Sequence, residues 1–116
     1  MNQSECIFCK IAAGDIPSTL RFEDDVCIAF NDLQPQAPTH ILIIPRAHID
    51  SLDAATDTQA ELLGHLLLTA ANLARGNGFA DDGYRVVINT NSDGGQTVFH
   101  LHIHLLAGRP FVFPPG

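Results

Sequence analysis

The chain has 116 residues, of which 46% are apolar and 16% are charged, a balance that predicts one globular domain spanning residues 1–116 rather than a disordered chain. Its formal net charge is −7, and such an acidic surface repels polyphosphate chains and anionic headgroups, which argues against nucleic acids and membranes as main partners. No stretch approaches the about 18 apolar residues of a membrane span, and the polar N-terminus lacks a signal-peptide pattern, so we expect a cytoplasmic protein.

Local patterns predict, in chain order, a short helix, three strands, a long helix and two further strands. The short helix is expected at 9–13, the strands at 21–23, 26–31 and 40–44, the long helix at 58–75, and the last strands at 84–90 and 98–106. The long helix is indicated by an apolar stripe at helical spacing, formed by Leu62, Leu63, Leu66, Leu67, Ala70, Leu73 and Ala74. These elements favour an α+β fold with a mainly antiparallel sheet.

The last predicted strand contains the sequence FHLHIHLL, in which His100, His102 and His104 alternate with apolar residues. Successive side chains of a strand point to opposite faces, so the three histidines are expected on one face and the apolar residues on the other. Three interpretations of these alternating histidines are possible: a polar outer face, a metal site, or nucleophilic catalysis by a neutral imidazole.

The residues before the histidines favour catalysis on an anionic group. Gly94 and Gly95 free the backbone to turn and to approach a ligand closely. Gln96 and Thr97 add side-chain donors beside backbone N–H groups, so this loop is able to hold a phosphate oxygen. An ordinary Gly-Gly turn is the alternative for the loop taken alone.

With these residues in view, the stretch GGQTVFHLHIHLLAGRP closely resembles the histidine triad family. The similarity extends to FEDDVCIAFNDLQPQAPTHILIIPRAHI, LLGHLL, GYRVVINTNSDGGQ and the terminal PPG. These segments resemble the nucleotide-binding branch of the family and together cover nearly the whole chain from Cys6 to Gly116. The resemblance implies a fold with a roughly five-stranded antiparallel sheet, one long helix and one short helix.

The resemblance also implies catalytic roles. His102 would attack the α-phosphorus and become nucleotidylated, and His104 would assist it and contact phosphate. His40, in the sequence PTH, would join a hydrogen-bond relay behind the site. Thr97 would lie near the leaving group.

A second set of residues would bind the nucleotide. Asp32 would accept hydrogen bonds from the ribose hydroxyls, and Phe30 and Leu33 would line the base pocket. The remaining predicted nucleotide contacts are Asn89, Gly95, Gln96, Thr97 and His104. Without the resemblance, core packing would be the better reading of Phe30 and Leu33, turn chemistry that of Asp32, and a strand-end hydrogen bond that of Asn89.

Cys6 and Cys9 form a CxxC pair, which by itself indicates half of a zinc site, a redox pair or two unrelated thiols. In zinc-bearing members of the family, a histidine after the PTH strand and the first histidine of the triad complete the site. These positions correspond to His48 and His100, so the resemblance implies structural Zn²⁺ held by Cys6, Cys9, His48 and His100. A metal-free pair with His100 in the relay is the alternative.

The implied function is hydrolysis of the P–N bond of purine nucleoside 5′-phosphoramidates through a nucleotidyl-histidine intermediate, with a nucleoside monophosphate as product. The alternatives are hydrolysis of dinucleoside polyphosphates and a nucleotide-binding or partner-binding module with vestigial catalysis. The resemblance also implies a homodimer. Phe113 stands where related nucleotide-binding proteins often carry tryptophan, so leaving-group specificity could differ here.

Overall fold

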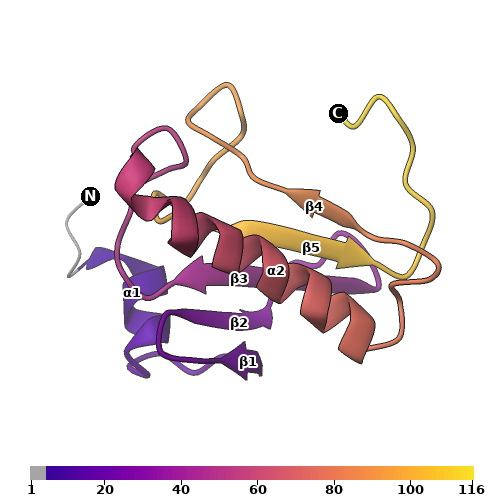
Figure 1. The fold of residues 1–116 in the computed structure, drawn as a ribbon, viewed down its shortest axis with the longest axis horizontal. Helices are drawn as coiled ribbons and strands as arrows, with labels where there is room; N and C mark the ends of the chain where they lie inside the picture. Colours follow the sequence, from indigo (N-terminus) through magenta and orange to yellow (C-terminus); the bar gives the residue numbers. More distant parts are fainter. Residues whose placement is uncertain (1–4) are drawn as a thin grey trace.

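The computed structural model describes residues 5–116 and shows a five-stranded sheet with a helix on each face (Figure 1). The helices are α1 (Ile7–Ala12) and α2 (Ala60–Gly76), the latter preceded by the short 3₁₀ helix η2 (Asp57–Gln59). The strands are β1 (Leu20–Glu23), β2 (Cys27–Asn31), β3 (Thr39–Pro45), β4 (Arg85–Val87) and β5 (Ile103–Ala107). Their order in the sheet is β1-β2-β3-β5-β4, and every neighbouring pair is antiparallel. The predicted α+β fold is confirmed.

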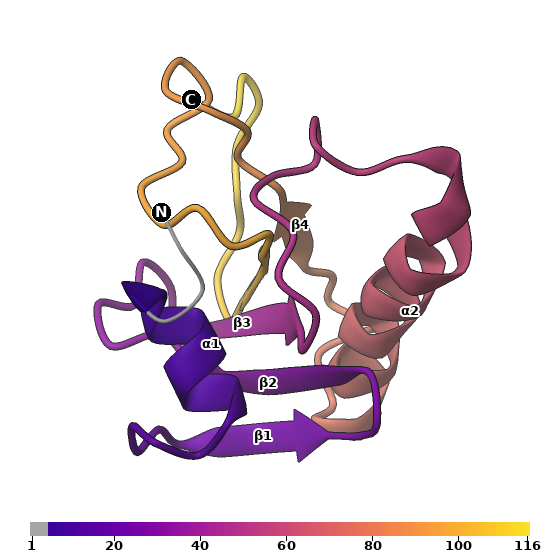
Figure 2. The same ribbon diagram turned by 90° about the vertical axis from the view of Figure 1, so that its left-hand side faces the viewer.

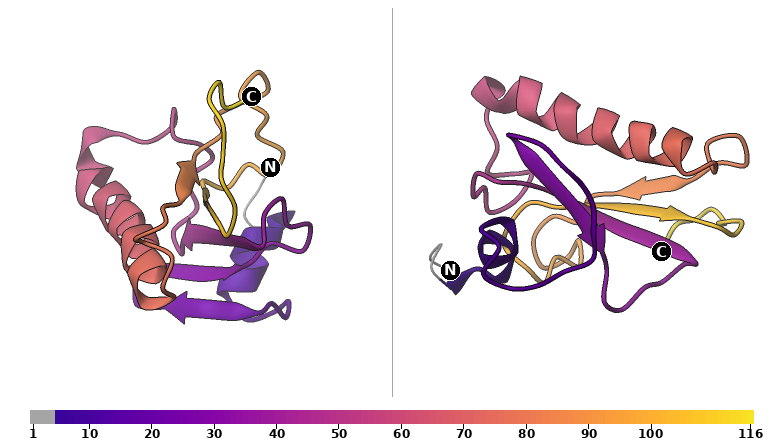
Figure 3. Two further views of the ribbon diagram at one scale, coloured as in Figure 1. Left: turned by 90° about the vertical axis from the view of Figure 1, so that its right-hand side faces the viewer. Right: turned by 90° about the horizontal axis from the view of Figure 1, so that it is seen from below.

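The two helices lie on opposite sides of the sheet (Figures 2 and 3). On the α2 side, Leu66, Ala70 and Leu73 pack against alternate residues of the central strands, such as Ile41 and Ile103. On the α1 side, a second apolar cluster contains Phe8 and Ile11 of α1 with Ile28, Phe30, Leu42 and Ile44 of the sheet. Alternation along the strands therefore builds a separate core on each face.

Local chemistry explains where several elements begin and end. Asp24 accepts the N–H groups of Val26 and Cys27 at 2.9 and 2.8 Å, which closes the turn between β1 and β2. Thr56 and Gln59 form the capping box that starts the long helix. The sequence Thr58-Gln59-Ala60-Glu61 is compatible with a capping box or with a position just inside the helix, and the structure shows the second, with Thr58 inside η2. Among residues 5–116, no helix is both long and apolar enough to cross a bilayer.

Several predicted boundaries were wrong. The short helix begins at Ile7 rather than Cys9, because the Cys6 sulfur accepts the Cys9 N–H and acts as its N-cap. In place of the strand predicted at 84–90, the structure has the shorter strand β4, Arg85–Val87. Leu67 is 46% exposed, outside the buried stripe of α2.

The predicted strand 98–106 also differs, because β5 begins only at Ile103. Leu101 donates its N–H to the carbonyl of Ile49 at 2.7 Å, beyond the end of β3, so residues 98–102 lie outside the sheet ladder. His100 and His102 therefore precede β5, and only His104 lies within it. The irregular approach brings the His102 and His104 rings to 5.1 Å, closer together than a regular strand predicts.

Candidate functional site: two adjacent histidine clusters

The histidines of the FHLHIHLL stretch separate into two clusters on the α1 side of the sheet. Phe8 of α1 meets the rings of both His100 and His102 edge-on, with centroids at 6.0 and 5.1 Å. His100 joins Cys6, Cys9 and His48, whereas His104 contacts His40 and stacks edge-on against His102. The predicted shared face is thus retained, although its members have different partners.

The first cluster, here called the thiol–imidazole cluster, consists of Cys6, Cys9, His48 and His100. Its ligand atoms all lie within 4.8 Å of one another. The Cys6 sulfur is 3.3 Å from His100 Nδ1, and the Cys9 sulfur is 3.2 Å from His48 Nδ1 and 3.4 Å from His100 Nδ1. The structure therefore brings together all four residues that the resemblance implied as ligands.

Both imidazoles of this cluster turn Nδ1 toward the sulfurs because Nε2 is bound elsewhere. His100 Nε2–H donates to the carbonyl of Pro45 at 2.8 Å, and His48 Nε2–H donates to the carboxylate of Asp50 at 2.8 Å. A carbonyl and a carboxylate can only accept, so each Nδ1 carries the lone pair. Second bonds of this kind, from the far ring nitrogen to an oxygen, typically orient histidine ligands around a metal ion.

The donor set fits a tetrahedral Zn²⁺ site. Two sulfurs and two imidazole nitrogens are a common structural zinc set, and four protein ligands leave no position open for water. In the metal-free protein, burial and the neighbouring Cys6 raise the pKa of the Cys9 thiol to about 11, so the cysteine is not activated as a nucleophile. Reactive cysteines require a lowered thiol pKa.

The second cluster, here called the histidine relay, consists of Gln36, His40, His102 and His104, with Asp32 at its edge. His102 Nδ1–H donates to the carbonyl of His100 at 2.7 Å. A carbonyl cannot donate, so the proton of the neutral ring lies on Nδ1 and the lone pair on Nε2. His102 is 6% exposed, and its burial lowers its pKa below the usual 6.5. Its ring is therefore neutral and nucleophilic at neutral pH.

Proton positions on the other two rings follow from one backbone bond. The Gln36 N–H donates to His40 Nδ1 at 3.0 Å, so the proton of the neutral His40 ring lies on Nε2. His40 Nε2 lies 2.8 Å from His104 Nδ1, to which it donates. His104 must then carry its proton on Nε2, a buried atom without a hydrogen-bond partner among residues 5–116. Burial and the neighbouring histidines lower the pKa of His104 to about 4.

The unpartnered N–H of His104 points to a missing partner, since buried polar groups are normally hydrogen-bonded. A lone pair on His102 and a free donor on His104 make a pair that can attack an electrophile and donate a hydrogen bond to it. Asp32 lies at the edge of this arrangement, with its carboxylate 3.4 Å from His40 Nε2.

The loop before the histidines differs from its prediction in one respect. Gln96 is 6% exposed, and both protons of its amide bind carbonyls, those of Asp50 at 2.8 Å and Val98 at 3.0 Å. Its side-chain oxygen accepts the N–H of Asn91, and its own N–H binds the Asn91 carbonyl. Gln96 therefore holds the loop in place, and Thr97, which is exposed, is the side chain left to face a ligand.

The remaining predicted nucleotide residues are dispersed around this site. Phe30 is 4% exposed and packs edge-on against Phe8 at 5.6 Å, whereas Leu33 is 93% exposed. Asn89 lies half-buried after the end of β4. Gly95 takes a φ of 83° within the turn, a conformation that favours glycine.

The sequence did not indicate Gln36, because this residue contributes its backbone N–H to His40, and a backbone group does not depend on residue type. Nor did the sequence indicate Asp50 and Pro45, which orient the imidazoles of the thiol–imidazole cluster. Asp50 follows His48 by two residues, and an acidic residue near a ligand histidine is a signal that could have indicated it.

Comparison with known proteins gives consistent matches over nearly the whole chain. The HIT domain family model matches residues 13–111. A purine nucleoside phosphoramidase of Escherichia coli K12 is 48% identical over 106 residues, which cover 91% of this chain and 89% of that protein. An uncharacterised HIT-like protein of Synechocystis is 51% identical over 112 residues, 97% of each chain.

Solved structures agree with the sequence matches. A HIT family hydrolase from Legionella pneumophila superimposes with a TM-score of 0.95 at 52% identity, covering 97% of this chain and 100% of the other. A histidine triad protein from Clostridium difficile gives a TM-score of 0.93 at 48% identity, with 97% of each chain covered. The chain therefore belongs to the HIT domain family.

Proposed function

We propose that this protein hydrolyses the P–N bond of purine nucleoside 5′-phosphoramidates through a nucleotidyl intermediate on His102. The observation that carries the proposal is the bond from His102 Nδ1–H to the His100 carbonyl, which leaves Nε2 as a free lone pair on a buried, neutral ring. The E. coli relative named purine nucleoside phosphoramidase supports the substrate class.

In the first step, the His102 Nε2 lone pair attacks the α-phosphorus and forms a new N–P bond. The bond between phosphorus and the leaving amine breaks, its electron pair stays on that nitrogen, and the nitrogen takes up a proton from solvent, which the attacking water of the second step gives back. His104 Nε2–H donates a hydrogen bond to the phosphoryl group as charge develops there. Thr97 lies on the exposed side of the loop and is the candidate to assist the leaving group.

In the second step, water attacks the phosphorus of nucleotidyl-His102. The N–P bond breaks, its electron pair returns to Nε2, and the nucleoside monophosphate leaves with the oxygen of the water. The bond from His102 Nδ1 to His100 holds the ring in place through both steps, so little reorientation is required between attack and release.

The nucleoside itself would be held at the Asp32 side of the relay. One Asp32 oxygen already accepts the Gln34 N–H at 2.8 Å, and the other lies near His40. A carboxylate has lone pairs for further donors, which suits two ribose hydroxyls. Phe30, Leu33 and Asn89 remain predicted contacts of the base and sugar, and Gly95 and Thr97 remain predicted contacts of the phosphate.

The thiol–imidazole cluster would hold a structural Zn²⁺. Its two sulfurs and two Nδ1 atoms lie close enough to share one ion, and the Nε2 bonds to Pro45 and Asp50 orient both rings for it. When bound, the ion would crosslink the start of α1 to the segment after β3, through His48, and to the segment before β5, through His100. Zinc content of protein purified without added metal tests this site, and less than a few tenths of an equivalent would contradict it.

A homodimer is part of the same proposal. Val112 and Phe113 are 77% and 87% exposed in the single chain, and the C-terminal segment leaves the end of β5 (Figure 1). Exposed apolar side chains at a chain end favour burial against a second copy. Sedimentation equilibrium at two concentrations distinguishes a dimer from a monomer.

The decisive experiment for the reaction is monophosphate release from adenosine 5′-phosphoramidate and from diadenosine polyphosphate, with native protein and His102→Ala in parallel. Release from the phosphoramidate that is lost in the variant is the expected result. Release chiefly from the dinucleotide would assign the second reaction to the same nucleophile. Native protein that cleaves neither substrate, yet binds the monophosphate tightly, would replace the enzyme with a binding module.

A further inference from the structure

The histidine relay depends on a loop that is itself anchored from outside the site. Gln36 donates its N–H to His40 Nδ1 at 3.0 Å, and this bond sets the proton positions of both His40 and His104. Gln36 is exposed and lies between Pro35 and Ala37, in the loop of residues 32–38 that connects β2 to β3. An exposed loop of this kind requires a constraint if one of its N–H groups is to stay aimed at a buried ring.

Part of the constraint is local. Asp32 accepts the N–H of Gln34 at 2.8 Å, and the Gln36 side-chain amide donates to the Gln34 carbonyl at 3.0 Å. These bonds shape the loop but do not attach it to the sheet beside His104. The base of the loop is closed by the Asp32 N–H, which donates to the His40 carbonyl at 2.9 Å, and a further attachment, at Gln36, comes from the turn that follows β5.

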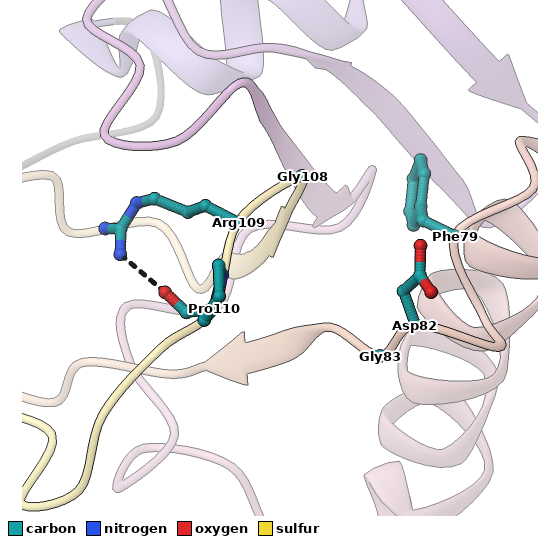
Figure 4. A pocket seen from close by; sticks show the side chains of 6 residues that line it. All are labelled: Phe79, Asp82, Gly83, Gly108, Arg109 and Pro110. Carbon is teal, nitrogen blue, oxygen red and sulfur yellow. Dashed lines mark hydrogen bonds between the residues drawn. The ribbon is translucent and has the colours of Figure 1, made fainter.

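Arg109, in this turn, donates from Nη2 to the carbonyl of Gln36 at 3.1 Å. Its guanidinium lies over the Phe111 ring, 4.4 Å from the centroid, and Nη1 donates to the Pro110 carbonyl at 3.1 Å. Figure 4 shows the guanidinium turned away from Phe79 and Asp82, which lie across a cavity of about 430 Å³. The stacking and the bond to Pro110 thus hold the guanidinium toward the loop.

Gly108 makes this approach possible. A Cβ atom at residue 108 would lie 2.8 Å from the Cβ of Pro38, and its φ is +99°. Only glycine adopts this backbone conformation readily and leaves room for Pro38. The turn after β5 and the 32–38 loop are therefore in contact at two points, Arg109 with Gln36 and Gly108 with Pro38.

We propose that Arg109 is a positioning residue for the proposed reaction: by holding the Gln36 carbonyl, it keeps the Gln36 N–H on His40 Nδ1 and thereby keeps the donor of His104 directed at the substrate. Among residues 5–116, the Arg109 guanidinium hydrogen-bonds the carbonyls of Gln36 and Pro110 and stacks on Phe111, so it acts on the relay through the loop. The inference rests on the proposed function for its catalytic consequence, whereas its structural part concerns the free protein.

The test compares Arg109→Ala with the native protein by two NMR readouts in the absence of substrate. These are the ¹⁵N–¹⁵N scalar coupling across the bond between Gln36 N–H and His40 Nδ1, and the hydrogen-exchange rate of the Gln36 amide. The variant is expected to lose the coupling and to exchange about tenfold faster. With phosphoramidate substrate, kcat is expected to fall about tenfold with little change in KM. Arg109→Lys, which keeps a donor, should recover part of both effects.

Arg85→Ala is the matched control. Arg85 also lies over the Phe111 ring, at 5.2 Å, and donates to the Val112 carbonyl, but it makes no bond to the 32–38 loop among the described contacts. It should retain the coupling and native kcat. The proposal is overturned if Arg109→Ala keeps the coupling and slow exchange, or if Arg85→Ala disturbs them equally. If the native protein has no turnover but Arg109→Ala still loses the coupling, the proposed function fails while the positioning role stands.

Discussion

The thiol–imidazole cluster and the histidine relay are built from the same side chain in neighbouring positions, yet they present opposite ring nitrogens. His100 binds the Pro45 carbonyl through Nε2 and leaves Nδ1 to the sulfurs. His102, two residues later, binds the His100 carbonyl through Nδ1 and leaves Nε2 free. The oxygen beside each ring, rather than the histidine itself, determines whether that histidine suits a metal ion or a phosphorus atom.

The two clusters are also connected. The carbonyl that orients His102 belongs to His100, whose ring lies among the sulfurs of Cys6 and Cys9. A metal ion bound there would fix His100 and, through its carbonyl, the ring of His102. The metal would then act on catalysis only through position, because all four of its ligand sites come from the chain.

The largest expected effect is that of removing the nucleophile. His102→Ala should lower kcat for adenosine 5′-phosphoramidate at least about a thousandfold while the zinc content stays unchanged. His65→Ala is the matched control, because the His65 side chain on α2 is 43% exposed and hydrogen-bonds only Asp24 among the described residues. Equal loss of activity in both variants would contradict the assignment of the nucleophile.

Removing a metal ligand should affect both clusters. Cys9→Ala is expected to lose the zinc, to unfold at a lower temperature, and to reduce kcat by about 10- to 100-fold through the loosened His100 carbonyl. Cys27→Ala, at a buried cysteine on the α2 side of the sheet, should keep the full zinc content. A Cys9→Ala protein with native zinc content would show that the metal is held elsewhere.

The relay predicts an acid-sensitive stability. His104 has its pKa lowered to about 4 in the folded protein, chiefly by burial, whereas an unfolded histidine titrates near 6.5. The unfolded chain therefore takes up protons first, so this stabilisation is complete above about pH 6.5 and is lost as pH falls toward 4. Thermal unfolding of the Cys9→Ala variant isolates this dependence from acid release of metal. His104→Gln should reduce the dependence without abolishing it, because burial also lowers the pKa values of His40 and His102. A melting temperature independent of pH in this window would exclude a buried neutral His104.

The smallest effect is expected from substitution of Asp50, which should change the metal affinity of the thiol–imidazole cluster and leave the histidine relay unchanged. Asp50→Ala removes the acceptor of His48 Nε2–H and should weaken zinc binding about tenfold. At saturating zinc the turnover should remain native, because His102 and its carbonyl partner are untouched. Competition with a chelator measures the affinity. Unchanged affinity would show that the Asp50 carboxylate does not help to orient His48 for the metal.

Periodicity predicted the elements of this fold well and their ends less well. The apolar stripe of α2 and the run of β-branched residues in β3 are local features, which the sequence shows directly. The start of β5 depends instead on a bond between Leu101 and Ile49, two segments far apart in the chain. A contact of that kind has no signature in the residues around either end.

The same distinction holds for the site. The resemblance identified Cys6, Cys9, His48 and His100 together, and the structure places their ligand atoms in one cluster. Gln36 and Pro45 contribute only backbone groups, so no side-chain pattern could indicate them. Gln96 was predicted by type as a ligand donor, but its amide is fully used by the surrounding backbone.

The most direct test of the account is to locate the covalent intermediate. Native protein mixed with adenosine 5′-phosphoramidate, quenched in base during turnover and digested, should yield one nucleotidylated peptide, with the adduct on His102 when the peptide is fragmented. His102→Ala should yield none. An adduct on His100 or His104, or steady turnover with no adduct on any histidine, would contradict the division of the two clusters proposed for this protein.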